Sequence, residues 1–202
     1  MEIIRDIEQG SEEWNQLRIG SVGASSISKI LGTKGKASTQ KKAYMYSLAA
    51  EILTGKKADT FSNQHMKNGI EFEANTRMEF QLETFKEVEE VALIFPDGRP
   101  VYHCSPDGII VGEEAGLELK SVIPATQVKY LDKGKLPTEY ILQCQMSMFV
   151  TGWSLWYFMS FCPGLEPLII EVERDDNLIE AIDHHLGNFV GDLGILVKKL
   201  KK

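Results

Sequence analysis

The sequence lacks the features of a secreted, membrane-spanning or disulfide-stabilised protein. Its 202 residues contain only three cysteines, which are far apart and form no C-x-x-C pair: Cys104, Cys144 and Cys162. An odd, scattered set is typical of reduced thiols in a cytoplasm. No apolar run reaches the roughly 18 residues of a membrane span, and the N-terminus has no apolar signal-peptide core. We therefore expect a cytoplasmic protein without a membrane partner.

The chain also lacks the excess of positive charge that is typical of nucleic-acid-binding proteins. It has 22 basic and 29 acidic residues, a net charge of −7. The charge is uneven, however, because residues 29–67 contain eight lysines and only two acidic residues. The lysines in its Gly/Ser/Thr-rich part are either solvated surface or a phosphate-contacting loop. They are Lys29, Lys34, Lys36, Lys41 and Lys42.

Repeats, low-complexity tracts and linkers are absent as well, so we expect one domain over residues 1–202, with a basic tail at 198–202. The hydrophobic fraction of 43% is near the globular average and excludes wholesale disorder.

Helical patterns dominate both ends of the chain. Ser11 is placed to cap a short helix, and Gly32 and Gly55 are placed to end two further helices. The predicted helices cover 24–31, 40–54, 63–85, 124–131, 137–150 and a last segment from Asp176. The helix at 63–85 has Ile70, Ala74, Met78 and Leu82 on one face. Prolines 124 and 137 are expected at first helical positions.

Short β-like runs separated by turn residues fill the middle of the chain. The runs at 88–95, 101–105, 108–111 and 117–120 are predicted to be consecutive antiparallel strands. Two more strands are predicted at 153–161 and 168–173. Together these elements predict an α/β (α+β) single domain with a central mixed β-sheet flanked by helices.

Three residues with complementary chemistry stand close together in this region. Asp107 lies in a Pro-Asp-Gly turn, and Glu118 and Lys120 lie in the following predicted strand. Successive strand residues point to opposite faces, so Glu118 and Lys120 share a face. If the two strands pair, both carboxylates converge at one sheet edge, where their hard oxygens suit Mg²⁺ or Mn²⁺ rather than zinc. The alternative is an ordinary hairpin turn beside an exposed ion pair.

The Asp107…Glu118-x-Lys120 pattern resembles that of the PD-(D/E)xK nucleases. Further blocks resemble one of their families in particular, the phage lambda exonuclease and YqaJ-type viral recombinase family, which implies a phage or prophage relative. The resemblance extends from about Glu8 to Arg174 and implies a restriction-endonuclease-like core. The blocks are EQG (8–10), WNQLRIG (14–20), AS (24–25), GIEFE (69–73), CSPDG (104–108), GLELK (116–120) and YILQCQMSM (140–148).

The resemblance implies a metal site and a group that acts on water. Asp107, Glu118 and the carbonyl of Leu119 would hold Mg²⁺, with Mn²⁺ as a substitute and two ions per active site. Lys120 would orient and activate the attacking water. Phosphodiester hydrolysis is a reaction that such a site supports.

Three further residues are implied to border this site. Glu73 matches an acidic residue that supports the metal through water, although it could instead form a helix ion pair with Arg77 at i+4. Glu71 lies two residues away, and an error of register would exchange the two roles. Gln143 and Tyr140 share a helix face that would border the active site, where Gln143 would contact the metal-site water or the scissile nucleotide. The alternative for both is a polar position on a half-buried helix.

A separate set is implied to bind the 5′-phosphate of a DNA end: Arg18, Ser25 and Ser105. A guanidinium can form paired hydrogen bonds with phosphate oxygens, and hydroxyl groups add donors. The alternative for Arg18 is a surface salt bridge with Glu12 or Glu13.

Other conspicuous residues favour structural interpretations. The His103-Cys104 pair is expected in the core, and His184-His185 on a helix face. The aromatic strand with Trp153, Trp156, Tyr157 and Phe158 is expected in the core or at a subunit interface rather than to stack on bases.

The resemblance thus implies a Mg²⁺-dependent enzyme that digests one strand of linear double-stranded DNA from 5′ to 3′. It would release mononucleotides, leave 3′ overhangs, prefer a 5′-phosphate end, and work processively as a ring-shaped homotrimer beside a single-strand annealing protein. The alternatives are another PD-(D/E)xK nuclease, such as an endonuclease or a RecB-like domain, and a non-catalytic scaffold that binds DNA ends.

Overall fold

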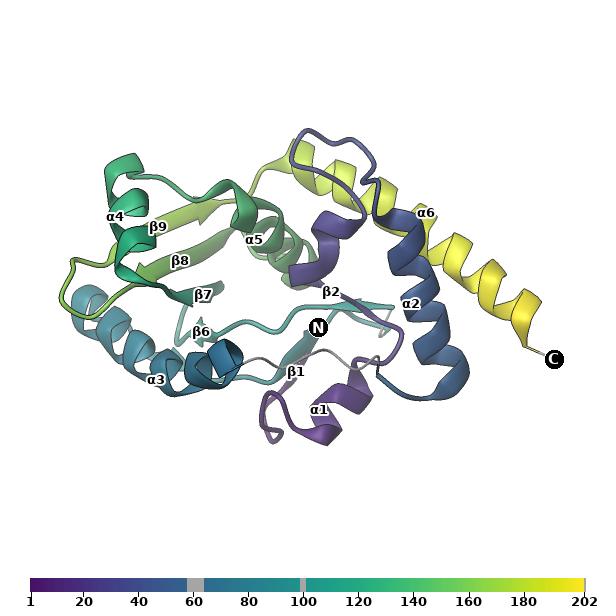
Figure 1. Ribbon diagram of the computed structural model, residues 1–202, viewed down its shortest axis with the longest axis horizontal. Helices are drawn as coiled ribbons and strands as arrows, with labels where there is room; N and C mark the ends of the chain where they lie inside the picture. The colour runs from purple at the N-terminus through teal and green to yellow at the C-terminus, as the bar shows by residue number, and fades with distance from the viewer. Residues whose placement is uncertain (58–63, 99–100, 202) are drawn as a thin grey trace.

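A computed structural model describes residues 1–57, 64–98 and 101–201, with side chains described for all of these except 64–72. Its centre is a five-stranded mixed sheet, as the sequence predicts (Figure 1). The strand order is β3 (Val88–Glu89), β6 (Gly108–Ile110), β7 (Ala115–Ser121), β8 (Leu155–Phe161) and β9 (Leu168–Glu173). Only the β7–β8 pair is parallel, and the other three pairs are antiparallel.

Two short strand pairs lie outside this sheet, so the four predicted strands do not form one continuous antiparallel series. Two of the predicted antiparallel contacts are present, the bridge between Ile94 and Cys104 and the pairing of β6 with β7. β1 (Glu2–Ile4) pairs antiparallel with β4 (Leu93–Phe95), while β2 (Val22–Gly23) pairs in parallel with β5 (Tyr102–His103). The run at 88–95 is therefore two strands that belong to different sheets. The chain changes its pairing partner between β3 and β4. At Ala92, just before β4, the N–H group donates to the Ile4 carbonyl (2.8 Å).

The N-terminal helices agree closely with the sequence pattern. They are α1 (Glu12–Leu17), the 3₁₀ helix η1 (Ala24–Lys29), α2 (Lys41–Thr54) and α3 (Gln64–Thr84). Ser11 accepts a hydrogen bond from the Trp14 N–H (3.2 Å), as a helix cap should. Gly55 ends α2 with φ of 66°, a left-handed conformation that suits glycine.

The C-terminal helices are α4 (Pro124–Lys133), α5 (Thr138–Thr151) and α6 (Asp176–Leu200). Pro124 is the first residue of α4, as predicted, but Pro137 lies one position earlier than predicted, as the extended N-cap of α5. α6 continues to Leu200, so Lys198 and Lys199 of the predicted basic tail belong to the helix. No helix in the described ranges is long and apolar enough to cross a membrane.

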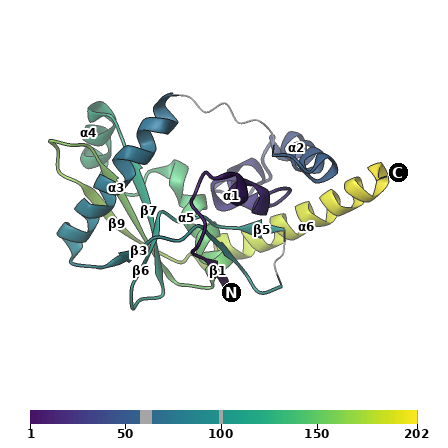
Figure 2. The same cartoon turned by 90° about the horizontal axis from the view of Figure 1, so that it is seen from below.

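Apolar side chains cover both faces of the sheet. One face packs Leu117 and Leu119 of β7 with Phe80 of α3. The other face packs the predicted aromatic strand, with Trp156 and Phe158, against α5, α6, η1 and α2. Helix α6 extends away from the sheet (Figures 1 and 2). The predicted apolar face of α3 is not buried: 60% of Met78 and 64% of Leu82 are exposed, and Ile70 is not among the described side chains.

Candidate active site

The hairpin of β6 and β7 brings Asp107 to the edge of β7, as the sequence predicts. Gly108 pairs with Leu117, and the Asp107 N–H donates to the Leu117 carbonyl (3.0 Å). The Asp107 carboxylate then accepts a hydrogen bond from the Leu119 N–H (Oδ2, 2.6 Å). Asp107 therefore continues the strand pairing with its side chain, which fixes the carboxylate beside β7.

Glu118 and Lys120 share the face of β7 opposite Leu117 and Leu119, which confirms the predicted alternation. Their side chains form an ion pair, and Lys120 Nζ also lies 3.9 Å from Asp107 Oδ2. The Glu118 side chain is only 3% exposed, compared with 15% for Asp107 and 27% for Lys120. Two carboxylates and one ammonium group thus converge at a site that opens to solvent mainly through Lys120.

Burial and charge act on both members of this pair. Burial raises the pKa of Glu118; Lys120 opposes that rise, and the neighbouring Asp107 adds to it. Burial alone would lower the pKa of Lys120, but Glu118 and Asp107 together outweigh burial and raise it. The raised pKa means that Lys120 holds its proton beside these two carboxyl groups.

The donors at this edge fit a hard divalent cation. Within one strand residue, the N–H and C=O groups point to the same side, so the Leu119 carbonyl points to the side where its N–H meets Asp107. The carboxylates of Asp107 and Glu118 and this carbonyl make an all-oxygen set of the kind Mg²⁺ prefers. This set has only two carboxylate side chains. Among the described residues there is no group of three or more His, Cys, Asp or Glu side chains that could hold a metal ion.

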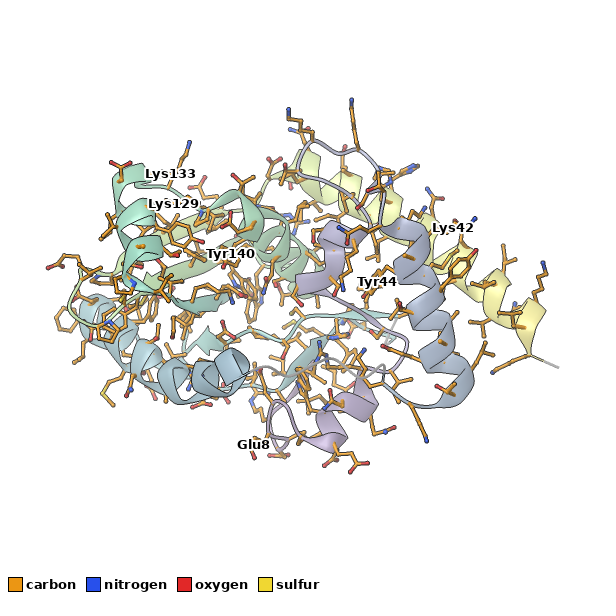
Figure 3. All side chains as sticks on the ribbon, in the orientation of Figure 1. Glu8, Lys42, Tyr44, Lys129, Lys133 and Tyr140 are labelled. Carbon is orange, nitrogen blue, oxygen red and sulfur yellow. The ribbon has the colours of Figure 1, made fainter. Side chains whose placement is uncertain are left out.

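Helix α5 places both of its predicted residues beside the ion pair. Gln143 hydrogen-bonds Glu118, which lowers the pKa of that carboxyl and partly opposes the effect of burial. The ring of Tyr140 lies 5.4 Å from Lys120 Nζ and stacks on Phe158 of β8 (5.1 Å between ring centroids). Figure 3 shows Tyr140 on α5, well separated from Tyr44 on α2.

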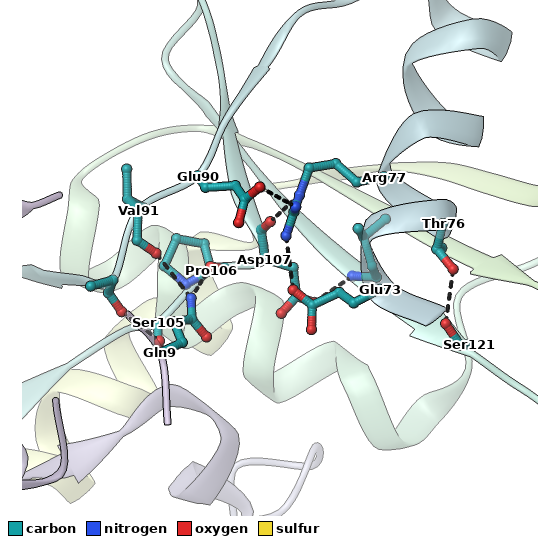
Figure 4. A network of polar contacts seen from close by, with 12 residues as sticks. Gln9, Glu73, Thr76, Arg77, Glu90, Val91, Ser105, Pro106, Asp107 and Ser121 are labelled. Atoms are coloured by element: carbon teal, nitrogen blue, oxygen red, sulfur yellow. Dashed lines mark hydrogen bonds and ion pairs between the residues drawn. The ribbon is translucent and has the colours of Figure 1, made fainter. Parts of the chain in front are cut away.

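Helix α3 contributes Glu73, and Arg77 connects it to the site (Figure 4). Arg77 donates to Glu73 Oε1 (2.9 Å), to the Asp107 carbonyl (Nε, 3.1 Å), and pairs with Glu90. The alternative i+4 ion pair is therefore present, and it joins Glu73 to Asp107. Burial, with the charge of Asp107, raises the pKa of Glu73 to about 7. The Glu71 side chain, the alternative to Glu73, lies outside the described side chains.

Gln9 supports the turn before Asp107, a role that the sequence analysis missed. Its Nε2 donates to the carbonyls of both Val91 and Pro106 (2.9 Å each) (Figure 4). The N-terminal segment is thus tied to the loop that carries Asp107. Gln9 lies in one of the resembling blocks, and that is the only signal that could have identified it.

Arg18 is half-buried and forms a separate cluster with Trp14 and His103, which we call the arginine pocket. Its guanidinium carbon lies 3.6 Å from the centre of the Trp14 ring, and its Nε donates to His103 Nε2 (3.0 Å). These partners replace the predicted alternative of a surface salt bridge. Ser25 is exposed in η1, and no described contact joins it to Arg18.

The two groups of residues meet at one backbone carbonyl. Ala92 O accepts hydrogen bonds from Ser105 Oγ (2.7 Å) and from Trp14 Nε1 (3.1 Å). Ser105 lies two residues before Asp107, and Trp14 stacks on Arg18. The Ala92 carbonyl therefore bridges the loop that carries Asp107 and the arginine pocket. The Ser105 hydroxyl already donates to Ala92, so it would bind a phosphate only by turning away.

The fold is that of known exonucleases. A solved structure of an alkaline exonuclease, LHK-Exo from Laribacter hongkongensis, superposes with a TM-score of 0.83 and 29% identity, covering 94% of this chain and 96% of the other. LHK-Exo in complex with dAMP gives a TM-score of 0.84 and 32% identity over 95% and 96% of the two chains. A phage-related exonuclease from Haemophilus somnus 129PT shares the fold at 15% identity (TM-score 0.64, 90% and 96% covered).

The sequence itself matches a family model over residues 13–154, which include every predicted site residue. No curated protein sequence matches the chain. The model is described as the YqaJ-like viral recombinase domain. Because the match covers more than half of the sequence, the chain belongs to the YqaJ-like viral recombinase family.

Proposed function

We propose that this protein is a metal-dependent DNA exonuclease that digests one strand of linear duplex DNA from its 5′ end. The observation that carries the proposal is the convergence of Asp107, Glu118 and Lys120 at one edge of β7. Two structures of LHK-Exo, at 29% and 32% identity, align over nearly the whole length of both chains.

Asp107, Glu118 and the Leu119 carbonyl would hold Mg²⁺, with Mn²⁺ as a substitute, and two ions would fit the family resemblance. Mg²⁺ keeps several waters and substrate phosphates as ligands, so three protein oxygens are enough. When bound, the metal would lower the pKa of the attacking water and stabilise charge on the leaving oxygen.

The other residues of the site would position water and phosphate. Lys120 would hold the water through its ammonium group, which contacts both carboxylates. Gln143 and Tyr140 lie beside Glu118 and Lys120, within reach of a nucleotide at the metal. Glu73 faces Asp107 from α3 and would hydrogen-bond a metal-bound water.

The arginine pocket would bind the 5′-phosphate of the DNA end, through Arg18 with Ser25 and Ser105. The bridge at Ala92 places this pocket next to the metal-site loop, as a nuclease that cuts close to an end requires. Release of mononucleotides is supported by LHK-Exo, whose structure was solved with the mononucleotide dAMP. Digestion from the 5′ end would leave a 3′ overhang.

A homotrimeric ring would make digestion processive. α3 presents a solvent-facing apolar stripe, Ala74, Met78 and Leu82, followed by Phe85, which is 93% exposed. Exposed stripes of this kind commonly mark subunit contacts. Sedimentation velocity should show a trimer. The family resemblance also points to a single-strand annealing protein as partner in recombination.

The function is tested with end-labelled linear duplexes that carry either a 5′-phosphate or a 5′-hydroxyl, in Mg²⁺ or in EDTA. We expect mononucleotide release from the 5′-phosphorylated strand that stops in EDTA. A covalently closed circle cut as fast as the linear duplex would instead indicate an endonuclease. No nucleotide release under any condition would indicate a non-catalytic protein that binds DNA ends.

A further inference from the structure

Arg18 is held by a buried histidine that the sequence analysis assigned only to the core. His103 is 1% exposed, and its two ring nitrogens have different partners. Nε2 meets Arg18 Nε at 3.0 Å, and Nδ1 meets Ser21 Oγ at 2.8 Å. Ser21 is buried as well.

The chemistry of arginine fixes the state of this ring. The Nε atom of a guanidinium always carries a hydrogen and cannot accept one, so His103 Nε2 must be the acceptor. The ring hydrogen then lies on Nδ1 and is donated to Ser21. Burial, with the charges of Arg18 and Lys57, lowers the pKa of His103 to about 3, which agrees with a neutral ring.

The absence of a side chain at Gly23 leaves room for the contact between Arg18 and His103. Gly23 of β2 pairs with His103 of β5, and a side-chain carbon at Gly23 would lie 3.2 Å from His103 Nε2 and 3.6 Å from Arg18 Nη2. The guanidinium thus lies against the Trp14 ring, the imidazole and the backbone at the start of η1. Among the described residues, its one side-chain hydrogen bond is that from Nε to His103.

We propose that His103 is a positioning residue for DNA-end recognition: it engages Nε of Arg18 so that the edge formed by Nη1 and Nη2 faces the 5′-phosphate. This inference rests on the proposed function, because it takes the phosphate as the ligand of Arg18. An arginine side chain has long, flexible torsions, and fixing it before binding lowers the entropy cost of the complex. A terminal guanidinium edge binds two phosphate oxygens in parallel, which gives both affinity and orientation.

The test uses two substitutions that each replace one half of the imidazole. His103→Gln extends an amide oxygen toward the Nε2 position and keeps an acceptor for Arg18. His103→Asn reaches only the Nδ1 position, so it keeps Ser21 as a partner and loses Arg18. Both remove the ring, so a purely structural role predicts similar effects for the two variants.

The measurement is the affinity of the full-length protein for linear duplex with a 5′-phosphate or a 5′-hydroxyl, by fluorescence anisotropy in EDTA, where no cleavage interferes. We expect His103→Asn to lower the preference for phosphate about tenfold, which corresponds to the contribution of one charge-assisted hydrogen bond. His103→Gln should retain most of the preference, and Arg18→Ala should abolish it. Ser21→Ala, the matched control in the same network, should keep it because Arg18 retains its acceptor.

The outcomes separate this inference from the proposed function. If the wild type prefers phosphate and Arg18→Ala abolishes that preference, an unchanged preference in His103→Asn overturns the positioning role alone. If the wild type shows no preference, the phosphate pocket fails and the inference fails with it. Should the variants not fold, ¹⁵N NMR of the wild-type histidines decides: an unprotonated Nε2 on His103 supports the role, and a protonated Nε2 contradicts it.

Discussion

Asp107 and Glu118 each have a structural role as well as a negative charge. Substitution by the amide of the same size removes the charge and keeps the structural role. Asp107→Asn keeps an acceptor for the Leu119 N–H, and Glu118→Gln keeps the size of a buried side chain. Both remove a negative charge that a metal requires. We expect nucleotide release to fall by more than about 100-fold, since even residues behind metal ligands contribute 10–100-fold. DNA binding in EDTA should be retained or strengthened, because a charge that repels phosphate is gone.

Glu90→Gln is the matched control for this loss. Glu90 is also a carboxylate and pairs with Arg77, but its side chain is 72% exposed and it is not a proposed ligand. Its activity should stay within about twofold of the wild type, as for most surface substitutions. Full activity in either the Asp107 or the Glu118 variant would contradict the metal assignment.

His103 also makes the stability of the protein depend on pH. Its folded pKa of about 3 lies below the ordinary value of 6.5, so only the unfolded chain takes up a proton as the pH falls from 7 to 5. The free energy of unfolding should therefore decrease, by about 2 kcal/mol at pH 5 from this residue alone. Urea unfolding at 25 °C, compared between the wild type and His103→Gln at pH 7 and pH 5, measures this contribution.

Glu73 acts with the opposite sign and cancels in that comparison. Its raised pKa of about 7 means that the native state binds a proton before the unfolded chain does, so acidification toward pH 5 stabilises the fold through this residue. Glu73 is present in both proteins, so the difference between them isolates His103. Equal losses of stability in the two proteins would show that the buried imidazole is protonated at pH 5.

Strand β7 depends on a glycine at the position that faces the largest buried side chain. Gly116 pairs with Trp156 of β8, and an added Cβ would overlap the six-membered part of the indole ring. The indole is fully buried and cannot move aside. Gly116→Ala should therefore cost about 1–3 kcal/mol of unfolding free energy, measured by urea denaturation, and it should also lower activity because Glu118 lies two residues along the strand.

Gly187 provides the opposite case within a helix. It lies exposed in α6, and a Cβ there would meet no other atom within 4 Å. Gly187→Ala should stabilise the protein by about 0.5–1 kcal/mol through helix propensity. Equal effects of the two alanines would show that the Trp156 ring does not restrict Gly116.

Elements whose signals are local could be predicted from the sequence. The helix that Ser11 caps, the helix that Gly55 ends and the hairpin that carries Asp107 depend on residues only a few positions apart. The run at 88–95 was misassigned because strand pairing depends on distant segments. Nothing local to Val88 or Leu93 indicates that one pairs with β6 and the other with the N-terminal strand.

The candidate active site likewise combines contacts that the local sequence predicts with contacts that only the fold creates. Asp107, Glu118 and Lys120 lie on one hairpin, so their pattern predicts their convergence. The connections of Arg77 to Asp107, of Gln9 to Pro106 and of Arg18 to His103 span 30, 97 and 85 residues. No spacing rule relates such residues, and only the fold brings them together.

The net charge of the whole molecule says little about where DNA would bind. Lys34 and Lys36 lie in a loop that His185 of α6 holds through the Gly35 carbonyl (3.0 Å), and the nearby Lys42 lies on α2 (Figure 3). All three are exposed, whereas Lys41 lies 3.8 Å from Asp192 and is partly neutralised. This places a local positive surface on an acidic protein. Tyr44 of α2 contacts η1 beside this surface, since its ring lies 4.9 Å from Lys29 Nζ and it hydrogen-bonds Ser26.

Salt dependence of DNA binding tests this surface. Replacing Lys34, Lys36 and Lys42 by glutamine should weaken binding to duplex DNA and reduce the slope of log K against log salt by up to about 3, because each phosphate contact contributes about 0.9. Three exposed lysines at the far end of α6 form the control with the same change of net charge: Lys198, Lys199 and Lys201. The control triple should leave the slope unchanged, since the end of α6 extends away from the sheet (Figures 1 and 2). Equal slopes for both triples would mean that the loop lysines are solvated surface and that DNA reaches the site along another path.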